Sequence, residues 1–309
     1  MTLWSEGPVR VRVPATSANL GPGFDALGLA LSLHDEIEAR VAPSGLRIEV
    51  SGEGAADVAG AEEAHLVIRA MRAAFDDLGA GQPPGITLSC VNQIPHGRGL
   101  GSSAAAIVAG VLAARALAGA GTGPGAALAL ANALEGHPDN VAPCLYGGLT
   151  IAWTTEGGAR AVRLEPAAVI KPVAIIAPAQ VSTKAARGLL PARVPHADAA
   201  RNAGRAALLV AAFTVRPEEL LDATEDRLHQ DYRASAMPAT SDLIGRLRAA
   251  GIPAVVSGAG PSVLALLTSR HGLDKLDSTV KETGTEWLIS PLDVERQGAS
   301  VALGVPGSR

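Results

Sequence analysis

The chain is poor in aromatic residues and has no excess of positive charge, and both shortages narrow its possible functions. Aromatic residues make up 3% of its 309 residues, so a core must be built mainly from Ala, Val, Leu and Ile. The 26 basic residues are fewer than the 30 acidic ones and are scattered along the chain. Nucleic-acid-binding surfaces normally show clustered Lys and Arg. We therefore expect no nucleic-acid partner.

Cysteines and long hydrophobic runs are also scarce. The only cysteines, Cys90 and Cys144, stand in no metal-ligand spacing, and two isolated thiols are typical of a reducing compartment. The longest apolar run, 104–114, is shorter than the ~18 residues that cross a bilayer. The first residues lack the basic and apolar segments of a secretory signal. These absences predict a cytoplasmic protein with no membrane partner.

What is present is a globular composition with regular hydrophobic patterns. Hydrophobic residues make up 48% of the chain, and its length allows two domains, for which we expect the ranges 1–165 and 166–309. Interrupted hydrophobicity at 156–166 suggests this boundary. Periodicity predicts strands at 9–13, 37–41, 46–50, 86–91, 149–153, 172–177, 287–289 and 299–303. It predicts helices at 66–78, from 104 onward, and at 126–135, 199–213, 217–221 and 240–250.

The most informative segment is 95–106, Pro-His-Gly-Arg-Gly-Leu-Gly-Ser-Ser-Ala-Ala-Ala. Its alternating glycines allow positive φ angles. Ser102 and Ser103 follow, and we expect them to cap the helix that begins there. A glycine loop leading into a helix N-terminus directs free N–H groups and the positive end of the helix dipole at one point. The segment therefore predicts a phosphate site, although an ordinary flexible helix start is an alternative.

Two other phosphate-binding loops fit this segment less well. A Walker A loop ends in Lys-Ser or Lys-Thr, and this loop has no such lysine. The range 99–104 fits the dinucleotide pattern G-x-G-x-x-A, but 92–98 separates it from the preceding strand. No carboxylate for a ribose stands near 121–125. A nicotinamide oxidoreductase is therefore disfavoured.

Polar residues also gather in two other places. The segment 14–25 is predicted to be a rigid irregular loop that displays Asn19 and Asp25, with a plain structural turn as the alternative. Glu135, His137 and Asn140 surround a helix end that Gly136 should cap. For His137, the alternative is a cation near the negative end of that helix.

Two further segments have simple structural interpretations. The range 255–264 is typical of a β-hairpin whose tip, rich in Gly and Ser, can lie against a phosphate site. His65 stands at the start of the helix 66–78, where we expect a surface position, with a helix cap or a ligand contact as the alternatives.

Taken together, the segments 14–25, 95–106 and 257–262 resemble the three motifs of the GHMP kinases, a superfamily of small-molecule kinases. The first of them, with 135–143 and 181–187, looks like the homoserine kinases within that superfamily. The likeness covers 9–303. It implies an α+β GHMP kinase fold with an N-terminal domain like ribosomal protein S5 domain 2, a C-terminal ferredoxin-like domain, an active site between them, and a homodimer.

The resemblance implies transfer of the γ-phosphoryl group of MgATP to the side-chain hydroxyl of L-homoserine, in threonine biosynthesis. It implies that Ser103 and Glu135 hold Mg²⁺ and that Gly258 and Gly260 face the nucleotide. His65 stands where homoserine kinases often have an asparagine that contacts adenine. The implied nucleotide loop consists of Pro95, His96, Gly97, Arg98, Gly99, Leu100, Gly101, Ser102, Ser103, Ala104 and Ala105.

For the amino-acid substrate, the resemblance implies that Arg187 and Arg233 bind the carboxylate, since a planar guanidinium suits that group. Asn19 and Asp25 match the residues at the amino and hydroxyl end. Thr183 and His137 are further candidates for the same pocket.

The catalytic candidates are Asn140 and Arg187. Other GHMP kinases have an aspartate where this chain has Asn140, and an amide cannot act as a base. This implies direct transfer with Asn140 orienting the hydroxyl. A GHMP kinase for mevalonate or shikimate is the nearest alternative, against which Asp25 argues as an ammonium partner. A catalytically silent nucleotide-binding regulator is another, against which Ser103 and Glu135 argue.

Overall fold

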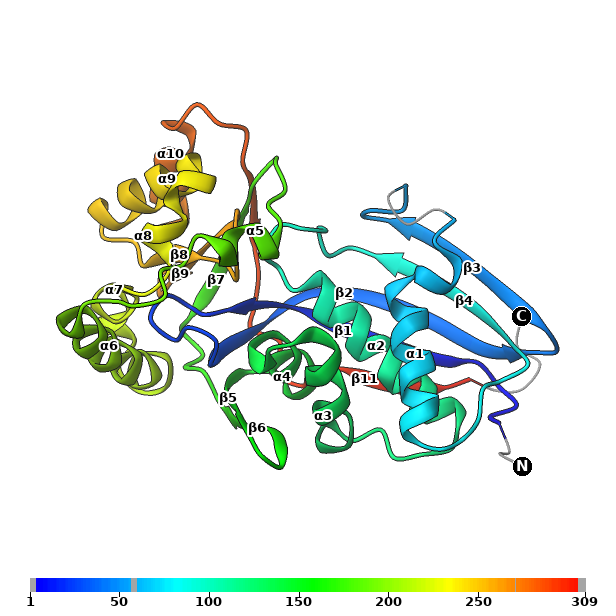
Figure 1. The fold of residues 1–309 in the computed structure, drawn as a ribbon. Coiled ribbons are helices and arrows are strands. Elements are labelled where there is room, and N and C mark those ends of the chain that lie inside the picture. The colour runs from blue at the N-terminus through cyan, green and yellow to red at the C-terminus, as the bar shows by residue number, and fades with distance from the viewer. Residues whose placement is uncertain (1–3, 57–59, 270, 305–309) are drawn as a thin grey trace.

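The computed structural model describes residues 4–56, 60–269 and 271–304, which form helices packed on two β-sheets (Figure 1). The chain thus has the α+β class expected for it. No helix in the described part of the chain is long and apolar enough to cross a bilayer.

The first sheet has the strand order β11-β1-β2-β4-β3; β5 joins it by pairing with β2, and β6 pairs with β5. β3 follows β2 in the sequence, but β4 lies between these two strands in the sheet. β3 runs parallel to β4. The two strands beside the turn at 43–45 therefore do not pair with each other in this order. The strands are β1 (Val9–Ala18), β2 (Leu27–Ala42), β3 (Gly45–Gly52), β4 (Gly85–Asn92), β5 (Leu149–Thr155), β6 (Gly158–Leu164) and β11 (Ser300–Leu303).

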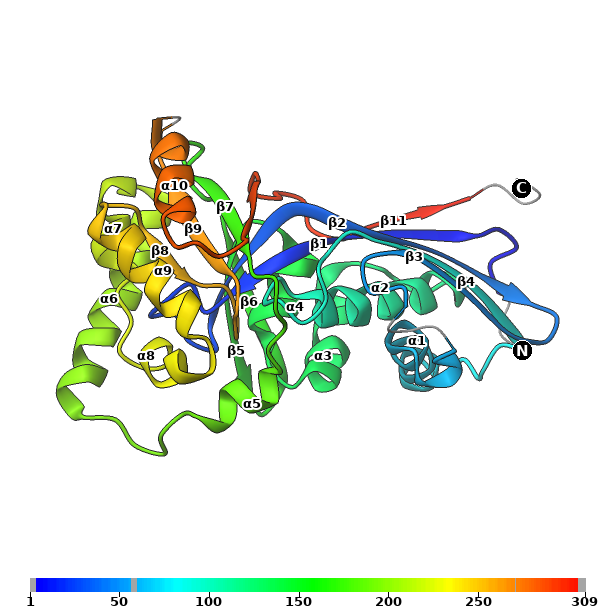
Figure 2. The same ribbon diagram turned by 90° about the horizontal axis from the view of Figure 1, so that it is seen from above.

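Four helices, α1 (Leu66–Asp77), α2 (Ser102–Leu117), α3 (Pro124–Glu135) and α4 (Pro138–Tyr146), pack on one face of this sheet, as Figure 2 shows. A short 3-10 helix, η1 (Glu62–Ala64), precedes α1. Helix α2 is buried on nearly every side, and a Cβ on its Gly110 would lie 2.5 Å from the Val67 carbonyl oxygen of α1. The small residues of α2 therefore allow close helix packing without aromatic side chains.

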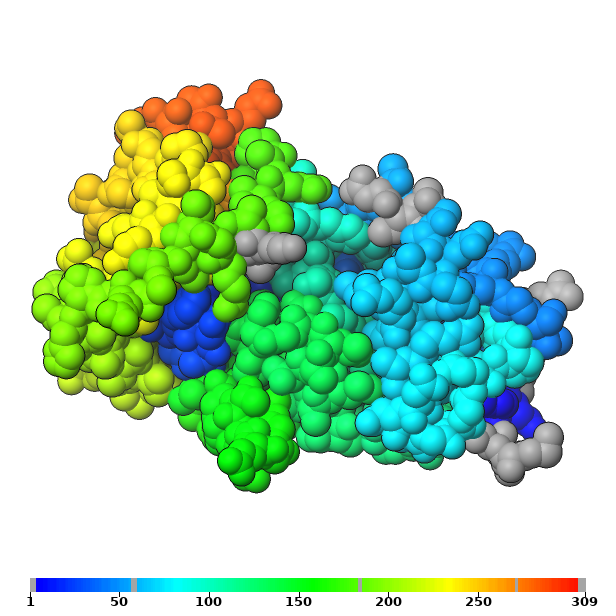
Figure 3. Space-filling model, in the orientation of Figure 1, coloured from blue at the N-terminus to red at the C-terminus, as the bar shows by residue number. Residues whose placement is uncertain are grey.

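The second sheet is antiparallel, with the order β10-β7-β9-β8. Its strands are β7 (Lys171–Ile176), β8 (Ala254–Val256), β9 (Val263–Leu267) and β10 (Leu288–Pro291). The helices of this half are α5 (Thr183–Gly188), α6 (His196–Thr214), η2 (Pro217–Glu219), α7 (Leu220–Ala223), α8 (Gln230–Arg233), η3 (Ala234–Ala236), α9 (Pro238–Ala249) and α10 (His271–Lys281). In Figure 3, dark-blue N-terminal residues are visible between the green and yellow-green parts of the surface.

Several sequence expectations need correction. The segment 14–18 is not loop but the end of β1, because after an irregularity at Pro14 the strand continues to pair with β2. Helix α4 was not predicted, since its prolines obscure the helical pattern, although Pro138 at the first position is compatible with a helix. Strand β6 occupies part of the expected boundary 156–166. Helix α10 was also missed.

Other expectations are confirmed. The range 255–264 forms the antiparallel pair β8–β9 around its glycine turn, and Gly136 ends α3 in the left-handed conformation. The division at residue 165 stays a prediction. The last strand of the described residues, β11, pairs with β1 and so returns to the first sheet.

Candidate active site

The three motif segments meet around residue 100. The Ser257 hydroxyl donates to the Gly99 carbonyl oxygen at 2.7 Å, and the Thr16 amide donates to the Leu100 carbonyl oxygen at 3.0 Å. A Cβ on Gly99 would lie 2.2 Å from the Ser257 carbonyl oxygen. The glycine at 99 is therefore required by the close approach of the hairpin tip.

The glycine loop leads directly into α2. Gly97, Gly99 and Gly101 have φ angles of 66°, 77° and 72°, which confirms the expected positive φ values. The capping role of Ser102 and Ser103 is wrong, because Gly101 is the N-cap residue and the serines are the first residues of the helix. No side-chain cap is seen for α2 among the described residues. Its first amides are therefore available to an anion.

Replacing Gly101 with alanine is expected to destabilise the fold by about 2 kcal/mol or more. A left-handed backbone costs an L-residue roughly 1–2 kcal/mol. In addition, the new Cβ would lie 2.0 Å from Thr16 Oγ1 and 3.2 Å from Asn140 Oδ1. Chemical denaturation measures the loss. Gly204, exposed within α6 with nothing described within 4 Å of a Cβ, is the control, where alanine should be neutral or stabilising. Equal effects at both positions would contradict this account.

A polar cavity of about 160 Å³ lies between the loop, α3, α4, α5 and α8. It brings together most of the predicted substrate and phosphate residues, from segments far apart in the sequence. Its lining residues are Asn19, Asp25, Gly97, Gly99, Gly101, Ser102, Ser103, Glu135, His137, Asp139, Asn140, Val181, Arg187, Arg233, Gly258, Ala259 and Gly260.

Ser103 and Glu135 adjoin at one side of this cavity. The Ser103 hydroxyl donates to Glu135 Oε1 at 2.7 Å. Burial raises the pKa of Glu135, partly offset by the Ser103 hydrogen bond. Carboxylate and hydroxyl oxygens suit a hard divalent cation. Among the described residues no cluster of three or more His, Cys, Asp or Glu could hold a metal, so a cation here needs further oxygens from a ligand.

Opposite charges face each other in the same cavity. Nη1 and Nη2 of Arg187 both donate to the Asp25 carboxylate, at 3.0 and 2.8 Å. This hydrogen bond is the main reason that the pKa of Arg187 is raised. Arg233 is 2% exposed, which makes it one of the largest fully buried side chains described. The cavity thus offers one carboxylate and two guanidinium groups.

The loop that carries Asp25 is held in an unusual conformation. Asn19 and Asp25 have φ angles of 68° and 55°, which are uncommon for residues other than glycine. Asn19 Nδ2 donates to the Gly258 carbonyl oxygen at 2.8 Å, and Asn19 Oδ1 accepts the Asp25 amide at 3.0 Å. Such strained positions gather at functional sites. The loop is thus the fixed frame that its composition predicts.

Asn140 and His137 lie at the start of α4. The Thr16 hydroxyl donates to Asn140 Oδ1 at 2.8 Å, which leaves the Asn140 amide N–H groups as donors. His137 Nδ1 lies 2.6 Å from Asp139 Oδ1, and this hydrogen bond raises the pKa of His137. His137 is thus the N-cap residue of α4 and a partner of Asp139, rather than only a cation at the end of α3.

A second, mostly apolar cavity of about 230 Å³ adjoins the first, and Ser102 and Ser103 line both. His65 lines it and is 7% exposed, so the surface position expected for His65 is wrong. His65 Nδ1 has no hydrogen-bond partner among the described residues. Its other lining residues are Asp35, Ile37, Leu66, Val67, Cys90, Asn92, His96, Ala105, Ala106 and Ala109.

Some predicted nucleotide-loop residues line neither cavity. Leu100 and Ala104 are fully buried, and Pro95 is also buried. Arg98 turns to the Pro178 carbonyl oxygen, to which it donates at 3.3 Å. The side chain of Thr183 lies outside the described part of the structure. Sequence reasoning missed Thr16 as the partner of Asn140, because 124 residues separate them.

Comparisons with known proteins agree with this geometry. The model of the GHMP kinases N terminal domain matches residues 65–148, and that of the GHMP kinases C terminal matches 209–285. The homoserine kinase of Streptomyces coelicolor is 57% identical over 95% of this chain and 94% of its own length. The homoserine kinase of Leifsonia xyli is 50% identical over 95% of this chain and 91% of its own length.

Solved structures show the same likeness. The structure of homoserine kinase from Cytophaga hutchinsonii superposes with a TM-score of 0.81 and 30% identity, covering 96% of this chain and 97% of that one. The L. major mevalonate kinase, with a TM-score of 0.70 and 15% identity over 93% and 96% of the two chains, shares the fold. With these identities over nearly the whole length, the chain belongs to the homoserine kinases of the GHMP kinase family.

Proposed function

We propose that the chain transfers the γ-phosphoryl group of MgATP to the side-chain hydroxyl of L-homoserine, giving O-phospho-L-homoserine and ADP. One observation carries this proposal: a cavity with opposite charges and an apolar cavity adjoin at Ser102 and Ser103. A zwitterion fits the first and a nucleotide base the second. The phosphates would then cross the N-terminus of α2.

The loop 97–101 and the first turn of α2 would bind the phosphates through backbone amides. Ser103 and Glu135 would hold Mg²⁺ together with phosphate oxygens, with Ser102 on a phosphate oxygen. A cation held there would neutralise the charge that develops on the phosphate oxygens during transfer. The loop has no Walker lysine, which makes this neutralisation more important.

Homoserine would form ion pairs with Asp25 and Arg187 in place of their pair with each other. Its carboxylate would face Arg187 and Arg233, and its ammonium group would face Asp25 with Asn19 alongside. The bidentate Asp25–Arg187 pair supports this arrangement, because a zwitterion offers each of these groups a replacement partner. His137 and Thr183 remain candidates for the same pocket.

Transfer would be direct. The homoserine oxygen attacks the γ-phosphorus, the bond to the β–γ bridging oxygen breaks, ADP leaves, and the hydroxyl proton passes to a phosphate oxygen or to water. Asn140 orients the hydroxyl through its free amide donors, since it cannot act as a base. An Asn140→Ala variant with unchanged kcat would argue against this role.

We place adenine in the second cavity, against His65. The buried and unpartnered Nδ1 of His65 supports this, since a buried polar atom needs a hydrogen-bond partner. Burial lowers the pKa of His65, which favours the neutral ring. The KM for ATP of a His65→Ala variant tests the assignment, and an unchanged KM would remove it.

Three broader statements are also part of the proposal: the division into 1–165 and 166–309, a homodimer, and a cytoplasmic location. The shared fold supports the division. Light scattering of the purified protein tests the dimer, and fractionation of the producing cells tests the location.

The experiment that tests the proposed function is ADP release with MgATP and a panel of alcohols. L-homoserine should give the highest kcat/KM, above L-serine, mevalonate and shikimate, because the reacting hydroxyl must reach the phosphate while both charges are bound. Preference for mevalonate or shikimate would place the chain with another GHMP activity. No ADP release with any alcohol would favour a silent nucleotide-binding regulator.

A further inference from the structure

Arg233 is buried, and one described side-chain hydrogen bond holds its head group. Its Nη1 donates to His229 Nδ1 at 3.3 Å, while its Nε has no hydrogen-bond partner among the described residues. Burial lowers the pKa of Arg233, as expected for a cation removed from water. His229 therefore supplies the described side-chain hydrogen bond that orients this guanidinium group.

The hydrogen bonds of His229 determine its tautomer. Arginine can only donate, so Nδ1 of His229 must be the acceptor. The proton is then on Nε2, which lies 2.9 Å from the Gly21 carbonyl oxygen, a group that can only accept. Burial lowers the pKa of His229, so the neutral ring that this arrangement needs is favoured. The two contacts thus require the same protonation state.

His229 also contacts the loop 19–25. Its ring stacks on Phe24, with ring centroids 5.1 Å apart and an interplanar angle of 26°. The Cζ atoms of Arg187 and Arg233 lie 5.8 and 5.5 Å from the centre of the same Phe24 ring. Phe24 directly precedes Asp25. One histidine therefore connects the arginine of α8 with the loop that carries the acidic partner.

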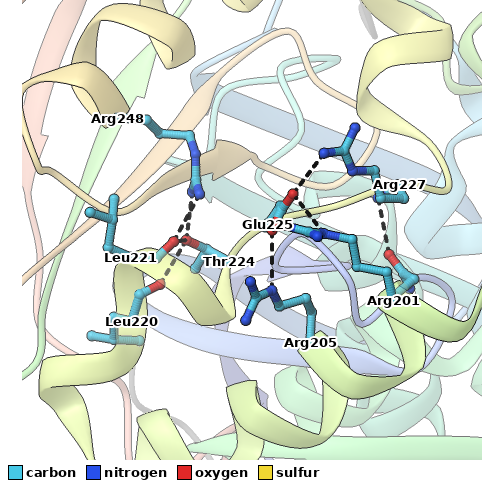
Figure 4. A network of polar contacts seen from close by, with 9 residues as sticks. Arg201, Arg205, Leu220, Leu221, Thr224, Glu225, Arg227 and Arg248 are labelled. Carbon is cyan, nitrogen blue, oxygen red and sulfur yellow. Dashed lines mark hydrogen bonds and ion pairs between the residues drawn. The ribbon is translucent and has the colours of Figure 1, made fainter. Parts of the chain in front are cut away.

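The backbone around His229 is itself held in place. The Asp226 carboxylate accepts the amides of Leu228, His229 and Gln230 at 3.0, 3.1 and 2.7 Å. The preceding Glu225 is bound by three arginines, Arg201, Arg205 and Arg227, as Figure 4 shows, and these lower the pKa of Glu225 to about 2, the Arg201 hydrogen bond most of all. These contacts hold the backbone of His229 in place, and therefore the point from which its side chain extends.

We propose that His229 is a positioning residue that aims Arg233 at the substrate carboxylate and fixes the loop 19–25 against it. The inference rests on the proposed substrate role of Arg233. His229 does not line the cavity, so it acts through Arg233 and Phe24 and not by touching the substrate.

Three substitutions separate the functions of the ring. In His229→Asn, Oδ1 lies the same number of bonds from Cα as Nδ1 and retains an acceptor for Arg233. In His229→Gln, Nε2 retains the donor to Gly21, but the acceptor Oε1 lies one bond farther from Cα than Nδ1 and no longer stands where Arg233 meets it. In His229→Phe, the stack on Phe24 remains and both hydrogen bonds are lost. Kinetics with both substrates are measured on the full-length chain.

The Gln and Phe variants should raise the KM for L-homoserine about tenfold, with kcat within about threefold and the KM for ATP unchanged, because a hydrogen bond from a charged donor is lost. The Asn variant should stay within about threefold of the parent, because it retains an acceptor for that donor. Parallel increases in both KM values, or an Asn variant as impaired as Gln, would overturn the proposal. If the Phe variant does not fold, the Asn–Gln comparison alone decides.

Arg233→Met separates this inference from the proposed function. It should raise the KM for homoserine, and adding His229→Gln to it should cause little further change, because no guanidinium remains to be aimed. If Arg233→Met leaves that KM unchanged, the proposed role of Arg233 is wrong. If Arg233→Met raises it but His229→Gln does not, only the positioning role of His229 is wrong.

Discussion

Replacing Glu135 with glutamine is expected to lower kcat by about 100- to 1,000-fold, the range found when one preorganised electrostatic partner of a transition state is removed. The glutamine oxygen can still accept the Ser103 hydrogen bond seen at 2.7 Å, so the geometry is kept and the negative charge is lost. ADP release at saturating homoserine, measured over a series of Mg²⁺ concentrations, gives the result. The variant should need much more Mg²⁺.

The raised pKa of Glu135 gives this prediction a pH signature. Its main cause is burial, and metal binding needs the deprotonated carboxylate. In the parent protein the Mg²⁺ requirement should therefore increase as the pH falls through the raised pKa of Glu135. The glutamine variant should lack that dependence, since it has no proton to lose.

Stability distinguishes loss of chemistry from loss of folding. A carboxyl group whose pKa is raised by the fold stabilises it at low pH, and this stability is lost as the pH rises through the folded pKa. The Glu135→Gln variant, whose side chain is permanently neutral, should therefore melt no lower than the parent at neutral pH. The exposed Glu156, changed to Gln, is the control and should leave both properties unchanged. Parent-like turnover in Glu135→Gln would contradict the proposed metal site.

Replacing Arg187 with methionine is expected to lower kcat/KM for homoserine about 100-fold. Two charge-assisted hydrogen bonds to the substrate carboxylate would be lost, at roughly 1.5 kcal/mol or more each. The stem of methionine retains apolar packing near Phe24, over which Arg187 now lies. Steady-state kinetics with homoserine and with ATP measure the effect, which should appear with homoserine and leave the KM for ATP nearly unchanged.

Loss of Arg187 also removes the partner of Asp25, so stability must be followed alongside activity. Both side chains are more than a third exposed, at 44% and 37%, so their ion pair contributes little to folding. Arg160→Met, on the exposed surface of β6, is the matched control and should behave like the parent. Lysine at 187 should recover only part of the loss, because it lacks the planar fork. Full activity of Arg187→Met would exclude a carboxylate-binding role.

Local chemistry explains which expectations were confirmed. The positive φ angles at Gly97, Gly99 and Gly101 follow from alternating glycines, and the β8–β9 hairpin follows from two apolar runs around a glycine turn. The capping prediction for Ser102 and Ser103 failed although serine is a good N-cap residue. Gly101 already takes that position, and Ser103 is bound instead to a carboxylate 32 residues away.

His65 and α4 are two further places where a local sequence pattern gave the wrong prediction. A histidine at a helix start is more often exposed, but packing against α2 and β4 encloses this one in a cavity lined by both. The prolines of α4 argue against a helix in isolation, whereas burial between α3 and β5 offsets that cost. In both cases tertiary packing overrides local preference.

By itself, the sequence determined the class of the protein, a globular kinase without an excess of positive charge. Its glycine loop precedes a helix N-terminus that suits a phosphate, and its motif residues identify its family. Only the tertiary structure decided which groups meet, namely Asp25 with Arg187, Thr16 with Asn140, and His229 with Arg233. Helix starts and turns follow from interactions between neighbouring residues. Contacts across 124 or 162 residues follow from how whole elements pack, and no local pattern records them.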